Sequence, residues 1–404
     1  MFTIPSLLHA YLSCRRNKRR TANALKFETS CEATLLKLLS ELQDHSYQPS
    51  RSICFVVTYP KVREVFAADF KDRILHHLLV SQLEKYYEKH FIYASFACRK
   101  AKGTLAAVTY TRQLILRATH NKTKNAYFGQ FDIKSFFTGI DKDILLSTLN
   151  KTINTRFPPE QRADLLWLTE VIINNDPTKN YQFRGDTKLF KQIPKHKSLF
   201  KAPKNKGLPI GNLTSQFFAN VYLDLLDQYC KRELKIKNYV RYVDDIVVIA
   251  DNLEQIKIWR RQINVFLKKH LKIKLHPGKD KYGSVYAGID FLGYIIKPDY
   301  QLVRKRIVSN LKTKLYYFNH GYLPLSNNQA QLLLPLATPP TMAEIFKMMI
   351  IINSYYGHLD HAQSYYLRKN IYKKHFGELG QYLYPLENYN YFNFDIFSIS
   401  EANK

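Results

Sequence analysis

Two adjacent aspartates stand between two runs of β-forming residues in the segment 238–250, NYVRYVDDIVVIA. Such runs on either side of a short polar pair are typical of a β-hairpin, so we expect Asp244 and Asp245 at its tip. Aspartate is also a common turn residue, and the pair alone does not distinguish a turn from a ligand site. Carboxylates beside buried apolar residues are costly, however, unless a positive group lies against them. The segment therefore predicts an antiparallel strand pair and favours a cation at its tip.

A second strand-like stretch, residues 126–133 (AYFGQFDI), places a third acid, Asp132, near its end. If the two strands are neighbours, three carboxylates meet at one edge of a sheet. Carboxylate oxygens are the ligands that Mg²⁺ prefers, with substrate phosphates completing the shell. Two such ions can activate a hydroxyl and neutralise a leaving group in phosphoryl transfer. The acids therefore predict a site for two Mg²⁺ ions, in which Mn²⁺ can substitute.

The charge balance points to a polyanionic partner. Lys and Arg number 61 against 33 Asp and Glu, which gives a net charge of +28 at pH 7. This excess favours nucleic acid over a basic protein without such a partner. Four arginines early in the chain are candidates for contact with a nucleic-acid backbone, with a solvated helix face as the alternative: Arg15, Arg16, Arg19 and Arg20.

Cysteine usage and hydropathy exclude several protein classes. The five cysteines show no metal-ligand spacing, so neither a zinc site nor a disulfide framework is indicated. Apolar runs stay short of the ~18 residues that a membrane helix needs. We expect a cytoplasmic protein that does not enter the membrane.

Hydrophobic periodicity predicts a mixture of helices and strands. Helices are expected in residues 1–50, a strand pair in residues 53–66, an amphipathic helix in residues 69–87 and further helix beyond Thr341. Between about residues 150 and 206 the pattern is weak. Residues 185–206 are rich in lysine, and we expect a mobile loop there.

Several motifs occur in an order that resembles that of reverse transcriptases. Residues 242–245 (YVDD) resemble the YxDD box, and residues 131–137 (FDIKSFF) resemble the first catalytic motif. The other matching segments are GLPIGNLTSQ (207–216), LHPGK (275–279), the primer-grip turn FLGY (291–294), and the fingers motifs PKVRE (60–64) and DRI (72–74). The resemblance extends over nearly the whole chain.

The resemblance implies an α+β right-hand polymerase fold for an RNA-directed DNA polymerase. Its implied parts are an N-terminal basic helical extension (1–50), fingers (51–118), a palm (119–295) with a Lys-rich insertion at about 150–206, and a thumb with the tail (296–404). The implied partners are an RNA template, a DNA or RNA primer and deoxynucleoside triphosphates. A dedicated non-coding RNA and an accessory protein are further candidates.

The same resemblance assigns roles to individual residues. Asp132, Asp244 and Asp245 are the implied catalytic metal ligands, and Ile133 would add its backbone carbonyl. Nucleotide-binding roles fall on Arg63, Arg73, Phe137, Ile210, Gly211, Gln216 and Lys279, and nucleic-acid contacts on Tyr242 and Gly293. Ordinary alternatives are surface ion pairs for the arginines, core packing for Phe137 and a solvated position for Lys279.

Phe137 would exclude ribonucleotides by colliding with their 2′-hydroxyl. Members of the family that copy more faithfully carry glutamine at the position of Ile210. An isoleucine cannot hydrogen-bond around the incoming nucleotide, so the resemblance implies error-prone copying.

Residues 94–100 (ASFACRK) and the phrase IGNLTSQ most resemble bacterial enzymes of diversity-generating retroelements and the related phage-defence group. Two other functions stay open on the sequence. One is a catalytically idle RNA-binding scaffold, which three intact aspartates disfavour. The other is an RNA-dependent RNA polymerase, which Phe137 disfavours.

Overall fold

The chain forms two compact units. The computed structural model describes residues 2–16, 18–59, 61–320, 322–324, 330–332 and 340–394. Unit 1 comprises Met1–Gly103 and Gly129–Tyr282, and unit 2 comprises Thr104–Phe128 and Gly283–Lys404. These limits differ from the fingers, palm and thumb limits expected from the sequence, which stay a prediction.

Unit 1 begins with the expected helical extension. Helices α1 (Ile4–Arg15), α2 (Ala22–Glu28) and α3 (Cys31–Gln43) precede the long helix α4 (Phe70–His90), on which α1 and α2 pack. The buried carboxylate of Asp72 in α4 accepts hydrogen bonds from the hydroxyl of Tyr47 (2.7 Å) and the backbone amide of Ser50 (2.9 Å). The segment after α3 is therefore fastened to α4.

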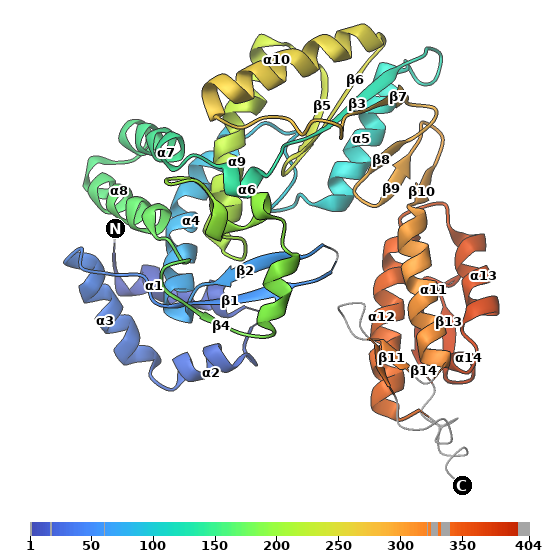
Figure 1. Cartoon of the computed structure of the whole chain (residues 1–404), viewed down its shortest axis with the longest axis horizontal. Coiled ribbons are helices and arrows are strands. Elements are labelled where there is room, and N and C mark those ends of the chain that lie inside the picture. The colour runs from blue at the N-terminus through green and yellow to red at the C-terminus, as the bar shows by residue number, and fades with distance from the viewer. Residues whose placement is uncertain are drawn as a thin grey trace. The chain divides into compact units, whose positions relative to one another are not determined.

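The predicted strand pair is confirmed and has a third member. Strands β1 (Ser52–Val57) and β2 (Arg63–Ala67) pair antiparallel, and β4 (Tyr181–Phe183) joins β1 in parallel, in the order β2-β1-β4 (Figure 1). Pro60, which begins one of the sequence motifs, lies outside the described residues. Strand β4 brings the Lys-rich insertion onto this sheet.

Residues 185–206, for which a mobile loop is expected, contain short helices, and their mobility stays a prediction. The Lys-rich insertion contains the end of α7 (Lys142–Arg156), α8 (Pro159–Asn174) and three short 3₁₀ helices, η1 (Thr187–Gln192), η2 (Lys195–Lys197) and η3 (Leu199–Lys201). Aromatic residues hidden among the lysines hold it, since the rings of Phe183 and Phe190 lie 4.8 Å apart and those of Phe66 and Phe200 lie 5.5 Å apart. The carboxylate of Glu64 accepts a hydrogen bond from the hydroxyl of Ser198 (2.9 Å).

A four-stranded sheet carries the predicted hairpin. Its order is β5-β6-β3-β7, with β5 (Asn238–Tyr242), β6 (Asp245–Ala250), β3 (Tyr127–Asp132) and β7 (Lys281–Ser284). The helices of this region are α6 (Phe136–Gly139), α9 (Leu213–Gln228), the π-helical turn η4 (Tyr229–Glu233) and α10 (Leu253–Leu271), which packs on β6. Every residue of β6 after Asp245 is buried, as in a strand covered on both faces.

Unit 2 combines one helix from the first half of the chain with the C-terminal part. It contains α5 (Thr104–Ala118) and the antiparallel sheet β10-β9-β8, formed by β8 (Ile289–Phe291), β9 (Tyr294–Ile296) and β10 (Gln301–Val303). Its remaining elements are α11 (Lys305–Asn319), β11 (Tyr322–Pro324), β12 (Ala330–Leu332), α12 (Met342–Asp360), α13 (Tyr365–His375), α14 (Leu379–Tyr382), β13 (Leu383–Leu386) and β14 (Tyr391–Phe394).

Leu311, Met348, Tyr356 and Phe376 belong to a buried cluster that joins α11 to α12 and to the segment after α13. The helix predicted beyond Thr341 is confirmed. In the part of the chain that is described, no helix has the length and apolar character to cross a membrane.

Candidate active site

The predicted hairpin is confirmed, but its turn lies one residue earlier than the pair of acids, so that Asp244 is in the turn and Asp245 begins β6. Tyr242 pairs with Asp245, which leaves Val243 and Asp244 as the turn residues. Val243 has φ of +53°, a left-handed conformation that is rare and unfavourable for a β-branched residue. Such a conformation persists only where the surrounding structure holds it.

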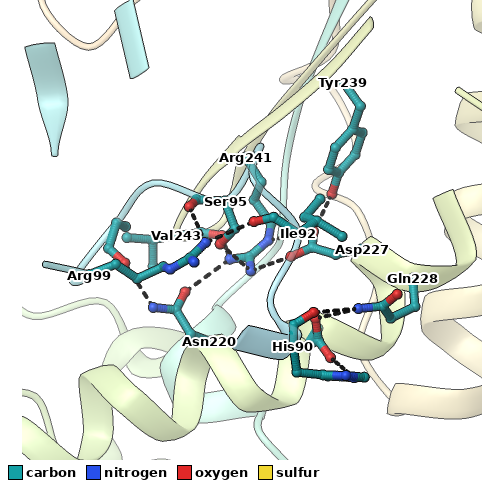
Figure 2. Close-up of polar contacts among 12 residues, drawn as sticks. His90, Ile92, Ser95, Arg99, Asn220, Asp227, Gln228, Tyr239, Arg241 and Val243 are labelled. Atoms are coloured by element: carbon teal, nitrogen blue, oxygen red, sulfur yellow. Dashed lines mark hydrogen bonds and ion pairs between the residues drawn. The ribbon is translucent and has the colours of Figure 1, made fainter. Parts of the chain in front are cut away.

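A buried guanidinium holds this turn (Figure 2). Nη1 of Arg241 donates to the carbonyl of Val243 (2.9 Å), while Nε and Nη2 donate to the two carboxylate oxygens of Asp227 at 2.8 and 2.6 Å. Nη2 also donates to the hydroxyl of Ser95 (2.9 Å), and Tyr239 donates to Asp227 (2.7 Å). Burial alone favours loss of the charge, but Asp227 raises the pKa of Arg241, so the pair is ionic.

Sequence reasoning missed this network. Neither Arg241 nor Asp227 was singled out, although both side chains are completely shielded from solvent. The available signal was an arginine inside the otherwise apolar and aromatic run YVRYV. A charge at a buried strand position requires a buried partner.

Asp132 lies on the strand next to the hairpin, as the third acid should. Strand β3 neighbours β6, and the amide of Ile133 donates to the carbonyl of Asp244 (3.3 Å). The amide of His276 donates to the carbonyl of Asp132 (2.7 Å), and Nζ of Lys279 forms an ion pair with Oδ2 of Asp132. Residues far apart in the sequence therefore meet at one edge of the sheet.

The carboxyls at this edge repel one another. Burial, followed by the charge of Asp132, raises the pKa of Asp244 to about 6. Burial, followed by the charges of Asp244 and Asp132, raises the pKa of Asp245 to about 7. Within the described residues, neither Asp244 nor Asp245 forms an ion pair. The charges of Lys279 and Lys61 oppose the rise in both pKa values without forming an ion pair with either carboxyl.

The chemistry of these residues fits a hard divalent cation, although the carboxylates are not drawn together around one point. In the described residues no group of three His, Cys, Asp or Glu side chains is arranged to hold a metal ion. The charge of Asp132 is neutralised here by Lys279. Two of the three carboxyls have a raised pKa and the third is ion-paired. Carboxylate oxygens are nevertheless the donors that Mg²⁺ uses.

One pocket collects most of the residues predicted for the site. From that prediction it is lined by Arg63, Asp132, Ile133, Phe137, Ile210, Asp244 and Lys279. Its wall also contains residues that were not predicted, among them Lys61, His196, Lys197 and His276. Two of these, His196 and Lys197, come from the insertion, and the hydroxyl of Thr138 donates to the carbonyl of His196 (3.0 Å). The pocket therefore has a carboxylate floor and a cationic wall.

The sequence profile of the family described as "Reverse transcriptase (RNA-dependent DNA polymerase)" matches residues 59–296. The chain belongs to the reverse transcriptase family. It has the α+β right-hand polymerase fold that the sequence predicted.

Two solved telomerase structures are similar to this reverse transcriptase. Telomerase from Candida albicans, in complex with a TWJ fragment of telomeric RNA, is 12% identical with a TM-score of 0.43, and the match covers 84% of this chain and 63% of that one. Apo telomerase from Candida tropicalis is 12% identical with a TM-score of 0.46, covering 81% and 61%. The chain thus spans less than two thirds of either telomerase. No curated protein sequence matches it.

The segment 209–212 of the reverse transcriptase is fixed against β2. The amide of Phe66 donates to the carbonyl of Ile210 (2.8 Å), and the amide of Ala68 donates to Asn212 (3.2 Å). Gly211 has φ of +124°, and a Cβ there would lie 2.8 Å from the carbonyl oxygen of Phe66. Only glycine fits this position, and its fit places Ile210 in the pocket wall.

Other predicted residues lie away from the pocket. Nε of Arg73 donates to the carbonyl of Ala68 (2.8 Å), and Arg73 does not line the pocket. Gln216 is exposed in the first turn of α9, and Tyr242 and Asp245 are half-buried outside the lining.

Gly293 belongs to unit 2, where it has φ of +96° in the tight turn between β8 and β9. Arg15 forms an ion pair with Glu28, whereas Arg16, Arg19 and Arg20 are exposed around a surface hollow.

Proposed function

We propose that this reverse transcriptase is catalytically active and copies an RNA template into DNA from a DNA or RNA primer. The main support is the single pocket in which two of the three aspartates face Arg63, Phe137 and Ile210. A catalytically idle scaffold has no need for carboxyls that repel one another.

In this proposal Asp132, Asp244 and Asp245 hold two Mg²⁺ ions. The ions supply activation of the primer 3′-hydroxyl and neutralisation of the leaving pyrophosphate. Arg63 binds phosphate oxygens of the incoming triphosphate, a task that suits a guanidinium. Lys279 neutralises the charge of Asp132 and is the candidate proton donor to pyrophosphate.

The test is primer extension on a defined RNA template in Mg²⁺. Replacing Asp244 by alanine should lower deoxynucleotide incorporation at least about a thousandfold, because ion-dependent stabilisation is worth several kcal/mol. Asp251→Ala is the matched control, since Asp251 is an exposed acid at the other end of β6. RNA binding should persist in both variants. Undiminished extension by the Asp244 variant would refute the proposal.

Phe137 is proposed to select deoxyribonucleotides. Its ring is half-buried in the pocket wall, and its carbonyl accepts a hydrogen bond from the amide of Leu208 (2.9 Å). Phe137→Val should admit ribonucleotides while deoxynucleotide use changes less. Equal discrimination by variant and parent would return Phe137 to core packing, and efficient ribonucleotide use by the parent would favour an RNA polymerase.

The proposed biological setting is a diversity-generating retroelement or a phage-defence system, with a dedicated RNA and an accessory protein. Its support is the segment 94–100 and the IGNLTSQ phrase. Sequencing the RNA and cDNA that co-purify with the protein tests it. Frequent errors in cDNA that returns to one gene would favour the retroelement, and recovery of host messenger RNA alone would count against both settings.

A further inference from the structure

A second cavity, of about 470 Å³, adjoins the catalytic pocket in unit 1. Its lining includes six lysines, which together with His196 are called the lysine cleft: Lys134, Lys201, Lys206, Lys268, Lys272 and Lys274. The lysines come from the start of α6, the insertion and the C-terminal end of α10. No acidic residue is among the described residues that line it. Three residues, Ser135, Thr138 and His196, line both cavities, so the two spaces are neighbours.

The positive charges of the lysine cleft are largely uncompensated. Lys272 pairs with Asp141 (3.0 Å), and Nζ of Lys206 donates to the carbonyl of Lys272 (3.3 Å). In the described structure the side chains of Lys134, Lys201, Lys268 and Lys274 form neither an ion pair nor a hydrogen bond.

At the junction with the catalytic pocket the crowding of cations affects two side chains. Burial, followed by the charges of Lys197 and Lys134, lowers the pKa of His196. Burial, followed by Lys61 and Lys279, lowers the pKa of Lys197. Cations crowded in this way destabilise the protein until an anion lies among them.

A neutral donor lies at the junction as well. The hydroxyl of Ser135 is buried and has no hydrogen-bond partner, although buried hydroxyls almost always have one. Ser135 also has φ of +51°, an uncommon conformation for a residue with a side chain. A hydroxyl in this position is available to donate to an oxygen of a ligand that extends from one cavity into the other.

We propose that the lysine cleft binds a polyphosphate anion, the group shared by pyrophosphate and a free nucleoside triphosphate. Four unpaired ammonium groups spread over one cavity match a chain of phosphates better than one phosphate ion. The link to catalysis, in which the cleft receives departing pyrophosphate or the phosphates of a waiting nucleotide, rests on the proposed function. The binding itself does not.

Calorimetric titration of the full chain with inorganic tripolyphosphate, in a chelating buffer, tests the binding. The double variant Lys201→Gln/Lys268→Gln should weaken binding about tenfold, because each exposed ion pair contributes a few-fold. The matched control is Lys204→Gln/Lys269→Gln, which removes the same charge from exposed neighbours that do not line the cleft. The control should bind within about twofold of the parent. Unchanged melting temperatures would exclude misfolding.

Three outcomes would overturn the proposal. Equal weakening in both double variants would mean that general charge is responsible. Weakening by Lys279→Gln alone, as large as in the cleft variant, would place the anion in the catalytic pocket. Displacement of tripolyphosphate by a short RNA, but by neither pyrophosphate nor ATP, would assign the cleft to nucleic acid.

The order in which pyrophosphate and ATP displace tripolyphosphate identifies the preferred source. Because the titration needs no turnover, its result is separate from the polymerase assay. A chain that binds tripolyphosphate in the expected pattern but incorporates no nucleotide would refute the proposed function and leave the cleft assignment standing.

Discussion

Unit 1 contains two groups of acids whose charge is balanced in different ways. Asp227 faces Arg241 with two hydrogen bonds and receives a third from Tyr239, so its charge is neutralised inside the protein. Asp244 and Asp245 lie only a few residues beyond Arg241, have raised pKa values and form no ion pair among the described residues, although the charges of Lys279 and Lys61 act on both. An acid that the fold itself neutralises serves the fold. An acid left without a counterion is available to a cation from outside.

The largest expected effect is a difference in stability between two identical substitutions. Asp227→Asn should lower the free energy of unfolding by about 3–5 kcal/mol, because it leaves Arg241 buried and unpaired. Asp244→Asn should leave stability unchanged or raise it in metal-free buffer at pH 8, because it removes one of two repelling carboxylates. Urea denaturation of both variants measures the difference. Equal losses of unfolding free energy would mean that Asp227 and Asp244 contribute to stability in the same way.

Asp72 offers an intermediate case, a buried acid satisfied by hydrogen bonds without a cation. Burial, opposed by the hydrogen bonds from Tyr47 and Ser50, raises its pKa from 3.8 to about 6. As the pH rises, Asp72 therefore loses its proton in the unfolded chain before it does so in the folded protein. Ionisation of Asp72 should thus lower the free energy of unfolding by on the order of 3 kcal/mol between pH 4 and pH 6, and by no more above pH 6.

Denaturation midpoints of the parent and of Asp72→Asn across this pH range test the intermediate case. The asparagine variant should lose less stability than the parent as the pH rises, because its side chain does not titrate. A parent whose stability increases between pH 4 and pH 6 to the same extent as the variant would contradict the assignment.

A smaller effect concerns how completely the network is hydrogen-bonded. Ser95→Ala removes the hydroxyl that accepts from Nη2 of Arg241, while Asp227 still binds the same guanidinium. Loss of one acceptor from a buried charged donor should reduce stability by about 1–2 kcal/mol. Ser81→Ala, which removes a hydroxyl bonded within α4, is a control of similar size. Losses that match in the two variants would mean that Ser95 does not specifically support Arg241.

The smallest expected effect concerns the apolar wall of the pocket. If Ile210 contacts the nucleotide, Ile210→Gln adds a hydrogen bond worth roughly 0.5–1.5 kcal/mol and should lower the error rate about 2- to 13-fold. Error spectra of cDNA from both forms on one defined RNA measure this. Indistinguishable spectra would make Ile210 a packing residue.

Local patterns predicted the parts of the fold that depend on neighbours in the sequence. Strand alternation and turn chemistry indicated the hairpin at Asp244, and helical spacing indicated α4. The resemblance then identified Arg63, Phe137, Ile210 and Lys279 as pocket residues, and the structure brings these four together. Arg73 was assigned to the same set, but its Nε donates to the carbonyl of Ala68 just before its own helix instead.

What escaped prediction depends on pairing over long sequence distances. Arg241 and Asp227 lie on different elements, and no sequence motif links the two residues. Residues 185–206 seemed loop-like because they are rich in lysine, although a few aromatic rings are enough to pack this segment against Phe66. Composition averages over a segment, whereas packing depends on the few side chains that face inward.

Strand β4 has a consequence for how the chain assembles. It pairs with β1, a strand from much earlier in the chain, and Tyr181 lies opposite Ser52. During synthesis from the N-terminus, the backbone edge of β1 must therefore stay unpaired until the insertion has left the ribosome. Contacts of such long range slow folding, and an open strand edge is a template for pairing with other chains. Fragments that end before Tyr181 should accordingly aggregate, and a chaperone that covers this edge should raise the yield of the complete protein.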